Sequence, residues 1–378
     1  MDTTESPRGA VGKLASAAFD DCERAVRDTI AATEAQATEL AADLRSRGIE
    51  RLVLTGDGCS YTAELACEPS FIRCAGLPVA TVVTSDLPFY EGLVDDRTCV
   101  VVLSRTGERQ FVLDVVDSLA RRGPLLVGIT GNPRATTFCS LVDKVLQTKE
   151  GPEPAFLKSK STLAGIVSLF TLAAALGSAS GDGRQLDFAV VRKLPALINE
   201  GLLMASTSIR AAAESAARCE HWAILGSGAS FGAAADCALK LQEIAQVHAS
   251  AHRFGFFYHG PLGTMSPQWG AVLLVSPETR PWADRVAGEL AWAGVDPIIW
   301  IAAEPAPASA TSIVQTPDLG GMHVASAELF GPAVQLPALY RFIYELAIAR
   351  HLDPDRPPRM ERMLGLILPA GQTEPDLE

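Results

Sequence analysis

The chain contains two copies of one structural plan, and this internal repeat limits its fold more than any other feature. Four apolar runs of the first half return in the second half, in the same order and at nearly constant spacing. The aligned pairs are RLVLTGDGCS (51–60) with HWAILGSGAS (221–230), CVVVLSRTGE (99–108) with GAVLLVSPET (270–279), LLVGITGN (125–132) with DPIIWIAA (296–303), and KVLQT (144–148) with SIVQT (312–316). Chance seldom preserves both order and spacing, so the repeat predicts two domains of the same fold.

The composition of the repeated runs predicts parallel β-sheets. Short segments rich in Val, Ile and Leu alternate with helical segments, as is typical of strands buried between crossover helices. We therefore expect an α/β protein with two tandem doubly wound domains, whose parallel sheets are flanked by helices. The Gly- and Ser-rich segment GSASGDGRQ (177–185) is interpreted as the linker between them. The expected divisions are an N-terminal helical segment at 1–45, domains at 46–180 and 190–350, and a C-terminal tail at 351–378.

The charge and hydropathy of the chain exclude several classes of partner. Among 378 residues, Lys and Arg number 32 and Asp and Glu 44, so the formal net charge is −12. Without a basic run, such a chain is not expected to bind nucleic acid or an anionic membrane surface. The most apolar stretch (163–176) has only about 14 residues, which favours a buried helix over a membrane span. Any anionic ligand must therefore bind at a local site that opposes the global charge.

The cysteines indicate neither disulfides nor a metal centre. Eight of them are scattered along the chain, without a C-x-x-C pair or neighbouring histidines at ligand spacing. No stretch of signal-peptide type occurs in residues 1–30. The sequence therefore predicts a cytoplasmic protein of a reducing compartment, with no metal and no cofactor.

In each half, the first strand runs into a G-x-G-x-S turn. This turn lacks the third glycine and the later acidic residue of a dinucleotide fingerprint, so NAD is not expected. It is either a ligand-binding loop or a tight connection between strand and helix, and for 226–230 both interpretations stay open. For Gly58, Cys59 and Ser60 a neighbouring loop favours the ligand-binding role.

That neighbouring loop carries Ser104, Arg105, Thr106 and Arg109. Hydroxyls and backbone N–H groups on a Gly-containing turn that leads into a helix favour an anion, and the two arginines add positive charge. This pattern predicts a phosphate site, although a capped helix start with solvated arginines is the alternative. The corresponding segment 276–279 has no glycine and contains a proline, which removes an N–H group, so it is interpreted as a degenerate copy.

Acid–base chemistry is expected from Lys240, Glu243 and His259. Lys240 and Glu243 are three residues apart in ALKLQEIAQVHA, hence on one face of the expected helix, with little polar sequence around them. His259 follows in FGFFYHGPL, an expected ordered loop. A surface ion pair and a structural histidine are the alternatives, but a lysine, a carboxylate and a histidine that converge near a sheet edge would form an acid–base set.

These motifs resemble a known family. ALKLQEIAQVHA followed by HGPL, together with G-x-S at 58–60 and SRTGE at 104–108, is similar to the double-SIS (sugar isomerase) group, and in particular to the isomerase half of glutamine–fructose-6-phosphate aminotransferases. The resemblance covers about residues 45–350 and implies two tandem SIS domains. It implies that Glu243 moves a proton between C1 and C2 of a sugar phosphate and that Lys240 supports the relay. It further implies that His259 assists ring opening from the neighbouring subunit of a homodimer, and that the loop 104–106 holds the phosphate.

The chain also departs from the family pattern. Arg109 replaces the usual threonine, and 158–162 keeps only the polar character of the corresponding loop. Its two lysines, Lys158 and Lys160, could approach an anionic substrate, and Lys158 and Ser159 are predicted to bind it. No glutaminase segment is recognised, so glutamine is not expected to supply nitrogen. The C-terminal lysine that forms an imine in the synthases is missing, so synthase chemistry is not expected.

Together these features predict an aldose–ketose isomerase of sugar phosphates, or an amino-sugar-phosphate deaminase, that acts by C1–C2 proton transfer without glutamine hydrolysis. The alternatives are a fructosamine-phosphate deglycase and a non-catalytic regulatory protein that binds sugar phosphates. Retention of Lys240, Glu243 and His259 favours an enzyme, because a sensor has no chemical need of them.

Overall fold

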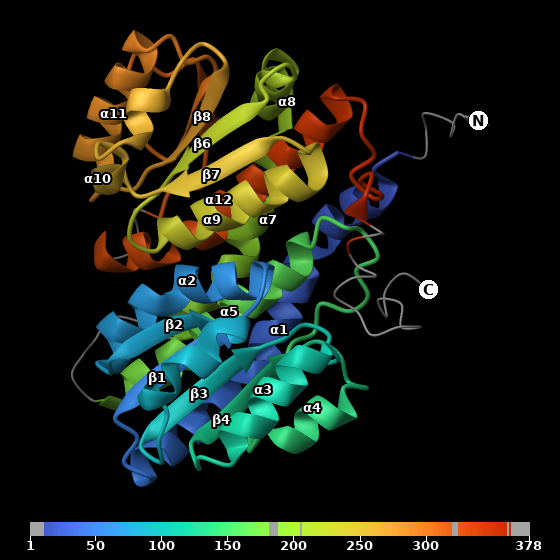
Figure 1. Ribbon diagram of the computed structural model, residues 1–378, viewed down its shortest axis with the longest axis vertical. Coiled ribbons are helices and arrows are strands. Elements are labelled where there is room, and N and C mark those ends of the chain that lie inside the picture. Colours follow the sequence, from blue (N-terminus) through green and yellow to red (C-terminus); the bar gives the residue numbers. More distant parts are fainter. Residues whose placement is uncertain (1–10, 181–187, 205, 320–323, 361–362, 364–378) are drawn as a thin grey trace.

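The repeated apolar runs form strands of two parallel, five-stranded β-sheets (Figure 1). The computed structural model describes residues 11–180, 188–204, 206–319, 324–360 and 363. The first sheet has the strand order β2-β1-β3-β4-β5 and the second the order β7-β6-β8-β9-β10, so the two halves share one topology. The strands are β1 (Arg51–Gly56), β2 (Val79–Val83), β3 (Thr98–Leu103), β4 (Leu125–Thr130), β5 (Lys144–Gln147), β6 (His221–Leu225), β7 (His248–His252), β8 (Trp269–Leu274), β9 (Ile298–Ala302) and β10 (Ser312–Gln315).

The four pairs of apolar segments that were aligned from the sequence do not include the second strand of either half. β2 and β7 each lie at the edge of a sheet and pair with one neighbour only, β1 and β6 respectively. Most of their side chains are half-buried, and β7 reads HASAH, so neither carries the continuous apolar run of a central strand. Their sequences, VATVV and HASAH, were not part of the repeat that the aligned runs detected.

Helices cover both faces of the sheets. They are α1 (Lys13–Ser46), α2 (Cys59–Ser70), α3 (Gln110–Ala120), α4 (Thr136–Leu141), α5 (Ser159–Ser180), α6 (Phe188–Val191), α7 (Leu194–Met204), α8 (Ser206–Ala216), α9 (Ser230–Lys240), α10 (Phe254–Phe257), α11 (Arg280–Trp292) and α12 (Val324–Ala349). Short π-helical turns follow α2 and α9, namely η1 (Phe71–Ala75) and η3 (Leu241–Ala245), and 3₁₀ segments lie at η2 (Thr84–Leu93) and η4 (Pro261–Thr264).

The apolar stretch 163–176 belongs to the buried helix α5, as predicted, and the helix is longer than this stretch. α5 continues through Ser180, into the segment expected to be a linker, while residues 181–187 lie outside the described residues. Its part Ser159–Ser178 is long and apolar enough to cross a membrane, yet 94% of the apolar window is buried inside the molecule. Burial against α1 and the first sheet accounts for this composition.

The two halves meet through their corresponding helices α2 and α9. Figure 1 shows the sheets one above the other, with α2 and α9 facing each other between them. At Gly232 of α9, a Cβ atom would clash with the backbone nitrogen of Ala66 in α2, so only glycine permits this approach. One hydrophobic core extends through both halves, and across it the rings of Phe170 and Phe330 lie 4.7 Å apart in an edge contact.

The segment after α12 returns to the N-terminal end of α1. Asp353 accepts a hydrogen bond from the N–H of Gly12 at 3.1 Å. Asp355 accepts hydrogen bonds from the N–H groups of Leu14 and Ala15, each at 2.8 Å. These hydrogen bonds satisfy N–H groups at the start of α1, which have no acceptor within the helix. They also hold the segment that leads to Met360 against α1.

Candidate active site

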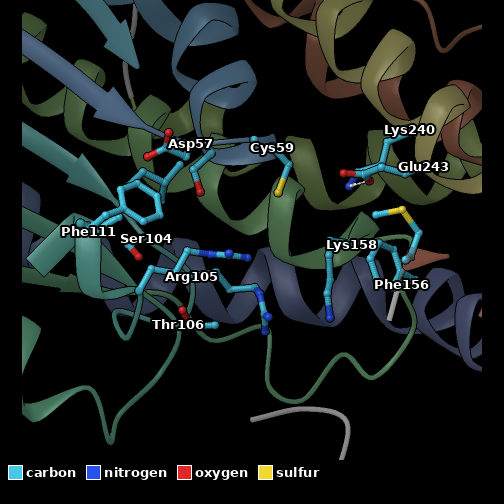
Figure 2. Close-up of a pocket in the computed structure, with 16 residues that line it drawn as sticks. Asp57, Cys59, Ser104, Arg105, Thr106, Phe111, Phe156, Lys158, Lys240 and Glu243 are labelled. Carbon is cyan, nitrogen blue, oxygen red and sulfur yellow. Dashed lines mark hydrogen bonds and ion pairs between the residues drawn. The ribbon is translucent and has the colours of Figure 1, made fainter. Parts of the chain in front are cut away.

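A cavity of about 320 Å³ opens at the carboxyl ends of β1 and β3, where it also faces α9 and η3 of the second half (Figure 2). Ligands of open α/β sheets bind at this edge. All predicted site residues line the cavity except His259 and Ser159. The predicted residues that line it are Gly58, Cys59, Ser60, Ser104, Arg105, Thr106, Arg109, Lys158, Lys240 and Glu243.

The turn after β1 presents the N-terminal end of α2 to the cavity. Gly58 has φ 56°, a left-handed conformation that favours glycine, and α2 begins at the next residue, Cys59. A Cβ atom on Gly56 would lie 2.8 Å from Cβ of Ser60, so this glycine lets the chain fold tightly back on itself. The positive end of the helix dipole therefore favours an anion here. Burial raises the pKa of the Cys59 thiol, which remains protonated.

The loop after β3 is held in shape by its own hydrogen bonds. Ser104 Oγ accepts the N–H of Gly107 at 3.2 Å, and Gly107 itself has φ 62°. From the end of β4, Asn132 donates its amide to the carbonyl of Thr106 at 2.8 Å and to Glu108 Oε1 at 3.0 Å. Asn132 was not singled out in the sequence, because its role depends on the pairing of β3 with β4. The hydroxyls of the loop are thus fixed before any ligand arrives.

Three cationic side chains line the cavity near this loop, namely Arg105, Arg109 and Lys158. Lys158 is only 7% exposed, and its Nζ donates a hydrogen bond to the carbonyl of Glu153 at 2.7 Å. Asp57 also lines the cavity; burial raises its pKa, while the charge of Arg109 acts in the opposite direction. In a chain of net charge −12, these cations concentrate positive charge at the cavity.

Lys240 and Glu243 form an ion pair that faces the same cavity. Lys240 Nζ lies 2.6 Å from Glu243 Oε2, and the two side chains are 3% and 20% exposed. The sequence predicts both on one α-helix, but α9 ends at Lys240 and Glu243 belongs to the π-helical turn η3. Burial disfavours the charged form of Lys240, yet the carboxylates of Glu243 and Asp236 outweigh it, so the pKa of Lys240 lies above its ordinary value.

A buried polar network lies behind this pair. Asp236, one helical turn before Lys240, is 1% exposed. It accepts hydrogen bonds from Thr62 Oγ1 of α2 at 2.7 Å and from the hydroxyl of Tyr340 in α12 at 2.8 Å. The network therefore joins both halves and the last helix directly below the cavity. None of these three residues was singled out in the sequence.

The structure does not bring His259 or Ser159 to the cavity. His259 is exposed and follows α10, with its ring 6.5 Å from that of Phe256. Ser159 is fully buried, and its hydroxyl donates to Glu153 Oε1 at 3.2 Å. Glu153 also accepts the N–H groups of Lys160 and Ser161, at 2.8 and 2.9 Å. Ser159 thus belongs to the capped start of α5, and within one chain the cavity lacks the histidine.

The apolar walls of the cavity were missed by the sequence analysis. They come from separate segments, so no single motif signals them, and Met360 reaches the cavity only because the tail is anchored on α1. These lining residues are Leu103, Phe111, Val112, Phe156 and Met360.

Comparison with known proteins identifies the fold of the first half. Residues 44–177 match the SIS domain family. The match lies within the first half of the chain. The chain is 28% identical over 321 residues to a glutamine–fructose-6-phosphate aminotransferase (isomerizing) of Aeropyrum pernix, covering 83% of this chain and 51% of the relative. It is 26% identical over 350 residues to the Pyrococcus horikoshii protein of that name, covering 90% and 55%. The chain thus spans about half the length of the curated relatives it matches.

Solved structures share the architecture of both sheets. The C-terminal domain of a glucosamine–fructose-6-phosphate aminotransferase from Francisella tularensis superposes with a TM-score of 0.80 at 22% identity, over 93% of this chain and all of that one. A tagatose-6-phosphate ketose/aldose isomerase from Escherichia coli gives 0.75 at 19% identity, over 90% and 94% of the two chains. At these identities the structural similarity establishes the fold.

Proposed function

We propose that this protein catalyses proton transfer between C1 and C2 of a sugar phosphate, as an aldose–ketose isomerase or an amino-sugar-phosphate deaminase. The observation that carries the proposal is that the Lys240–Glu243 pair and the loop 104–106 line one cavity. The aminotransferase and isomerase names of the relatives and of the structural neighbours point to the same class of chemistry.

In this proposal the phosphate binds at the first-half loops. Ser60, Ser104 and Thr106 supply hydroxyls, the start of α2 supplies N–H groups, and Arg105 with Arg109 supplies charge. Charge-assisted hydrogen bonds of this kind are stronger than those between neutral groups. Lys158 lies between the phosphate loop and the acid–base pair in Figure 2, where it meets oxygens of the sugar.

Glu243 is the proposed base. Its carboxylate removes the proton from C2 of an aldose to give an enediol and returns it to C1, and the reverse order applies to a ketose. Lys240 stays protonated beside it, donates a hydrogen bond to the carboxylate and stabilises negative charge that develops on the substrate oxygens. The proposed chemistry assigns no step to the Cys59 thiol, whose pKa is raised by burial, and it includes no glutamine hydrolysis.

The proposed active site is completed by His259 of a second subunit. His259 is exposed on a segment that also exposes Phe256, at 64%, and Tyr258, at 38%. A homodimer that buries these aromatic rings would bring the imidazole to the ring oxygen of the substrate, where it assists ring opening. We further propose that the second sheet is a second SIS domain and that the protein acts in the cytoplasm.

A fructosamine-phosphate deglycase is the second candidate. The cavity walls away from the phosphate loop are apolar, with Phe111, Phe156 and Met360 among them. Such walls suit a substrate whose sugar carries an organic amine. Deglycation begins with the same proton transfer, so it uses the same residues and differs in the product released.

The test is NMR of the full chain in D2O with fructose 6-phosphate, glucosamine 6-phosphate and a fructosamine 6-phosphate offered separately. We expect deuterium at C1 or C2 of one substrate, with released ammonia or free amine where the substrate carries nitrogen. Replacement of Glu243 by Gln keeps the shape of the side chain and removes the base, so we expect the exchange rate to fall by about 10²–10⁴-fold. The matched control is Glu214→Gln on the exposed face of α8, which should leave the rate unchanged.

Two results would contradict the proposal. Exchange that persists in Glu243→Gln would remove Glu243 from the reaction. Binding of these sugar phosphates by the wild-type chain without exchange or amine release would instead favour the regulatory protein.

A further inference from the structure

The second half repeats the backbone of the phosphate turn. The Gly226–Ser230 turn follows β6 as the Gly56–Ser60 turn follows β1, and the φ angles of Gly228 and Gly58 are 59° and 56°. α9 begins at this turn, as α2 begins at the first. The second sheet therefore presents the same arrangement of turn and helix start at its carboxyl edge.

Unlike the first turn, the second is covered by an acidic side chain of the same chain. Glu328, from α12, is 6% exposed. A Cβ atom on Gly228 would lie 2.8 Å from Glu328 Oε1, so the carboxyl group rests against the turn. Ser276, which follows β8, lies close enough to this carboxyl group to favour its ionised form. The carboxyl group thus contacts the turn that corresponds to Gly56–Ser60 and lies near the loop that corresponds to 104–106.

The loop after β8 has lost the features that a free phosphate needs. Strand register aligns Val275 with Ser104, since their N–H groups donate to the equivalent residues Ile301 and Ile129, each at 3.0 Å. A methyl-bearing side chain therefore stands where the first half has a hydroxyl. Ser276 Oγ and Thr279 Oγ1 lie 3.0 Å apart and bond to each other.

Other polar groups around Glu328 are few. Ser230 Oγ and Glu328 Oε2 are buried and have no hydrogen-bond partner among the described residues. The nearby charges are Glu278 and Arg73, which face each other at 3.7 Å. Burial raises the pKa of Glu328, whereas Ser276 and Arg73 favour its ionised form.

We propose that the Glu328 carboxylate is a built-in ligand of the second turn, which occupies the anion position there and leaves one phosphate site per chain. A tethered carboxylate loses no translational freedom on binding, so it outcompetes free anions at ordinary concentrations. It also stabilises the start of α9, the helix that carries Lys240 to the cavity. The inference rests on the proposed function in one respect, namely that the first half binds one phosphate.

The test removes the Glu328 carboxyl group by mutation and adds formate as a free carboxylate. In Glu328→Ala the vacated position accepts a small carboxylate, so we expect formate to raise the Tm of this variant by about 2–4 °C more than that of the wild type. Glu328→Gln is the matched control, because its amide still fills the position and should show no additional rise. If the alanine variant does not fold, Glu328→Ser, which keeps a polar side chain near Ser276, is measured in the same way.

Calorimetric titration of the full chain with inorganic phosphate separates this inference from the proposed function. We expect one site in the wild type, lost in Ser104→Ala/Thr106→Ala. A wild type that binds two phosphates, or equal formate effects in Glu328→Ala and the wild type, would overturn the inference. A wild type that binds no phosphate, together with a formate effect confined to Glu328→Ala, would support the built-in ligand and contradict the phosphate loop.

Discussion

At the scale of single residues, the buried carboxyl groups of this protein differ in how they are compensated. Asp236 has two hydrogen-bond donors and lies near Lys240, so it is a partnered group below the cavity. Glu64 of α2 is 0% exposed, and neither of its oxygens has a hydrogen-bond partner among the described residues. A buried charge without partners is costly, and such a group keeps its proton instead. Burial accordingly raises the pKa of Glu64 well above its ordinary value.

We predict that Glu64→Gln stabilises the protein at pH 7 by about 1 kcal/mol or more. The native state keeps the Glu64 proton above about pH 4.3, where an unfolded glutamate releases it. The free energy of unfolding of the wild-type protein therefore falls as the pH rises above about 4.3, and the Glu64→Gln variant should lose this pH dependence. Urea unfolding between pH 4 and pH 8 measures the difference, with Glu214→Gln as the exposed control. Equal pH dependence of wild type and Glu64→Gln would contradict the prediction.

At the scale of elements, the cavity depends on how closely α2 and α9 approach. α2 begins at the turn after β1, and α9 ends at Lys240. The distance between these helices therefore sets the distance between the proposed phosphate site and the Lys240–Glu243 pair. A π-helical turn follows each helix, and such turns are frequent at functional sites. In the second half this turn carries Glu243, which still reaches Lys240 at 2.6 Å.

We predict that Gly232→Ala destabilises the protein by about 1–3 kcal/mol, because its methyl group would clash with Ala66 and push the helices apart. The matched control is Gly288→Ala in the exposed face of α11, where a Cβ atom meets nothing within 4 Å. That variant should be neutral or more stable by about 0.5–1 kcal/mol, since alanine is the better helix former. Urea unfolding measures both, and equal effects of the two substitutions would show that the crossing tolerates a side chain.

At the scale of the whole molecule, the cavity combines segments far apart in the chain. Loops of the first half, the α9–η3 junction of the second and Met360 of the tail all line it, while His259 of the same chain does not. If the proposed homodimer supplies His259 from the second subunit, each active site contains Glu243 of one chain and His259 of the other.

This arrangement predicts complementation between inactive variants. In dimers mixed from Glu243→Gln and His259→Ala chains, one of the two sites keeps both native residues. Random mixing makes half of the dimers mixed, so co-expression should restore about a quarter of the wild-type rate. Mixing Glu243→Gln with Lys240→Ala is the control, because both changes affect the same side of the site and no intact site can form. Absence of recovery in the first mixture would contradict the shared site.

Most of the architecture could be predicted from local sequence. The four repeated runs of each half became strands, either inside a sheet or at one edge of it. The edge strands β2 and β7 and the full length of α5 could not be predicted, because half-buried strands and helix ends carry weak apolar patterns. The polar and charged residues of the loop 104–109 could also be recognised, because the loop follows the end of a strand. The Lys240–Glu243 pair could be recognised because its residues were expected on one face of a helix.

The sequence by itself determined the repeated α/β plan, the glycine turns and the chemical types gathered at the strand ends, because periodicity and turn conformation are local properties. Only the tertiary structure decided which of these residues share a cavity. It placed Ser159 in a helix cap and His259 on the surface, and it set Glu328 against the second turn. These outcomes depend on how α2, α9 and α12 pack together, and packing across hundreds of residues leaves no short-range pattern in the chain.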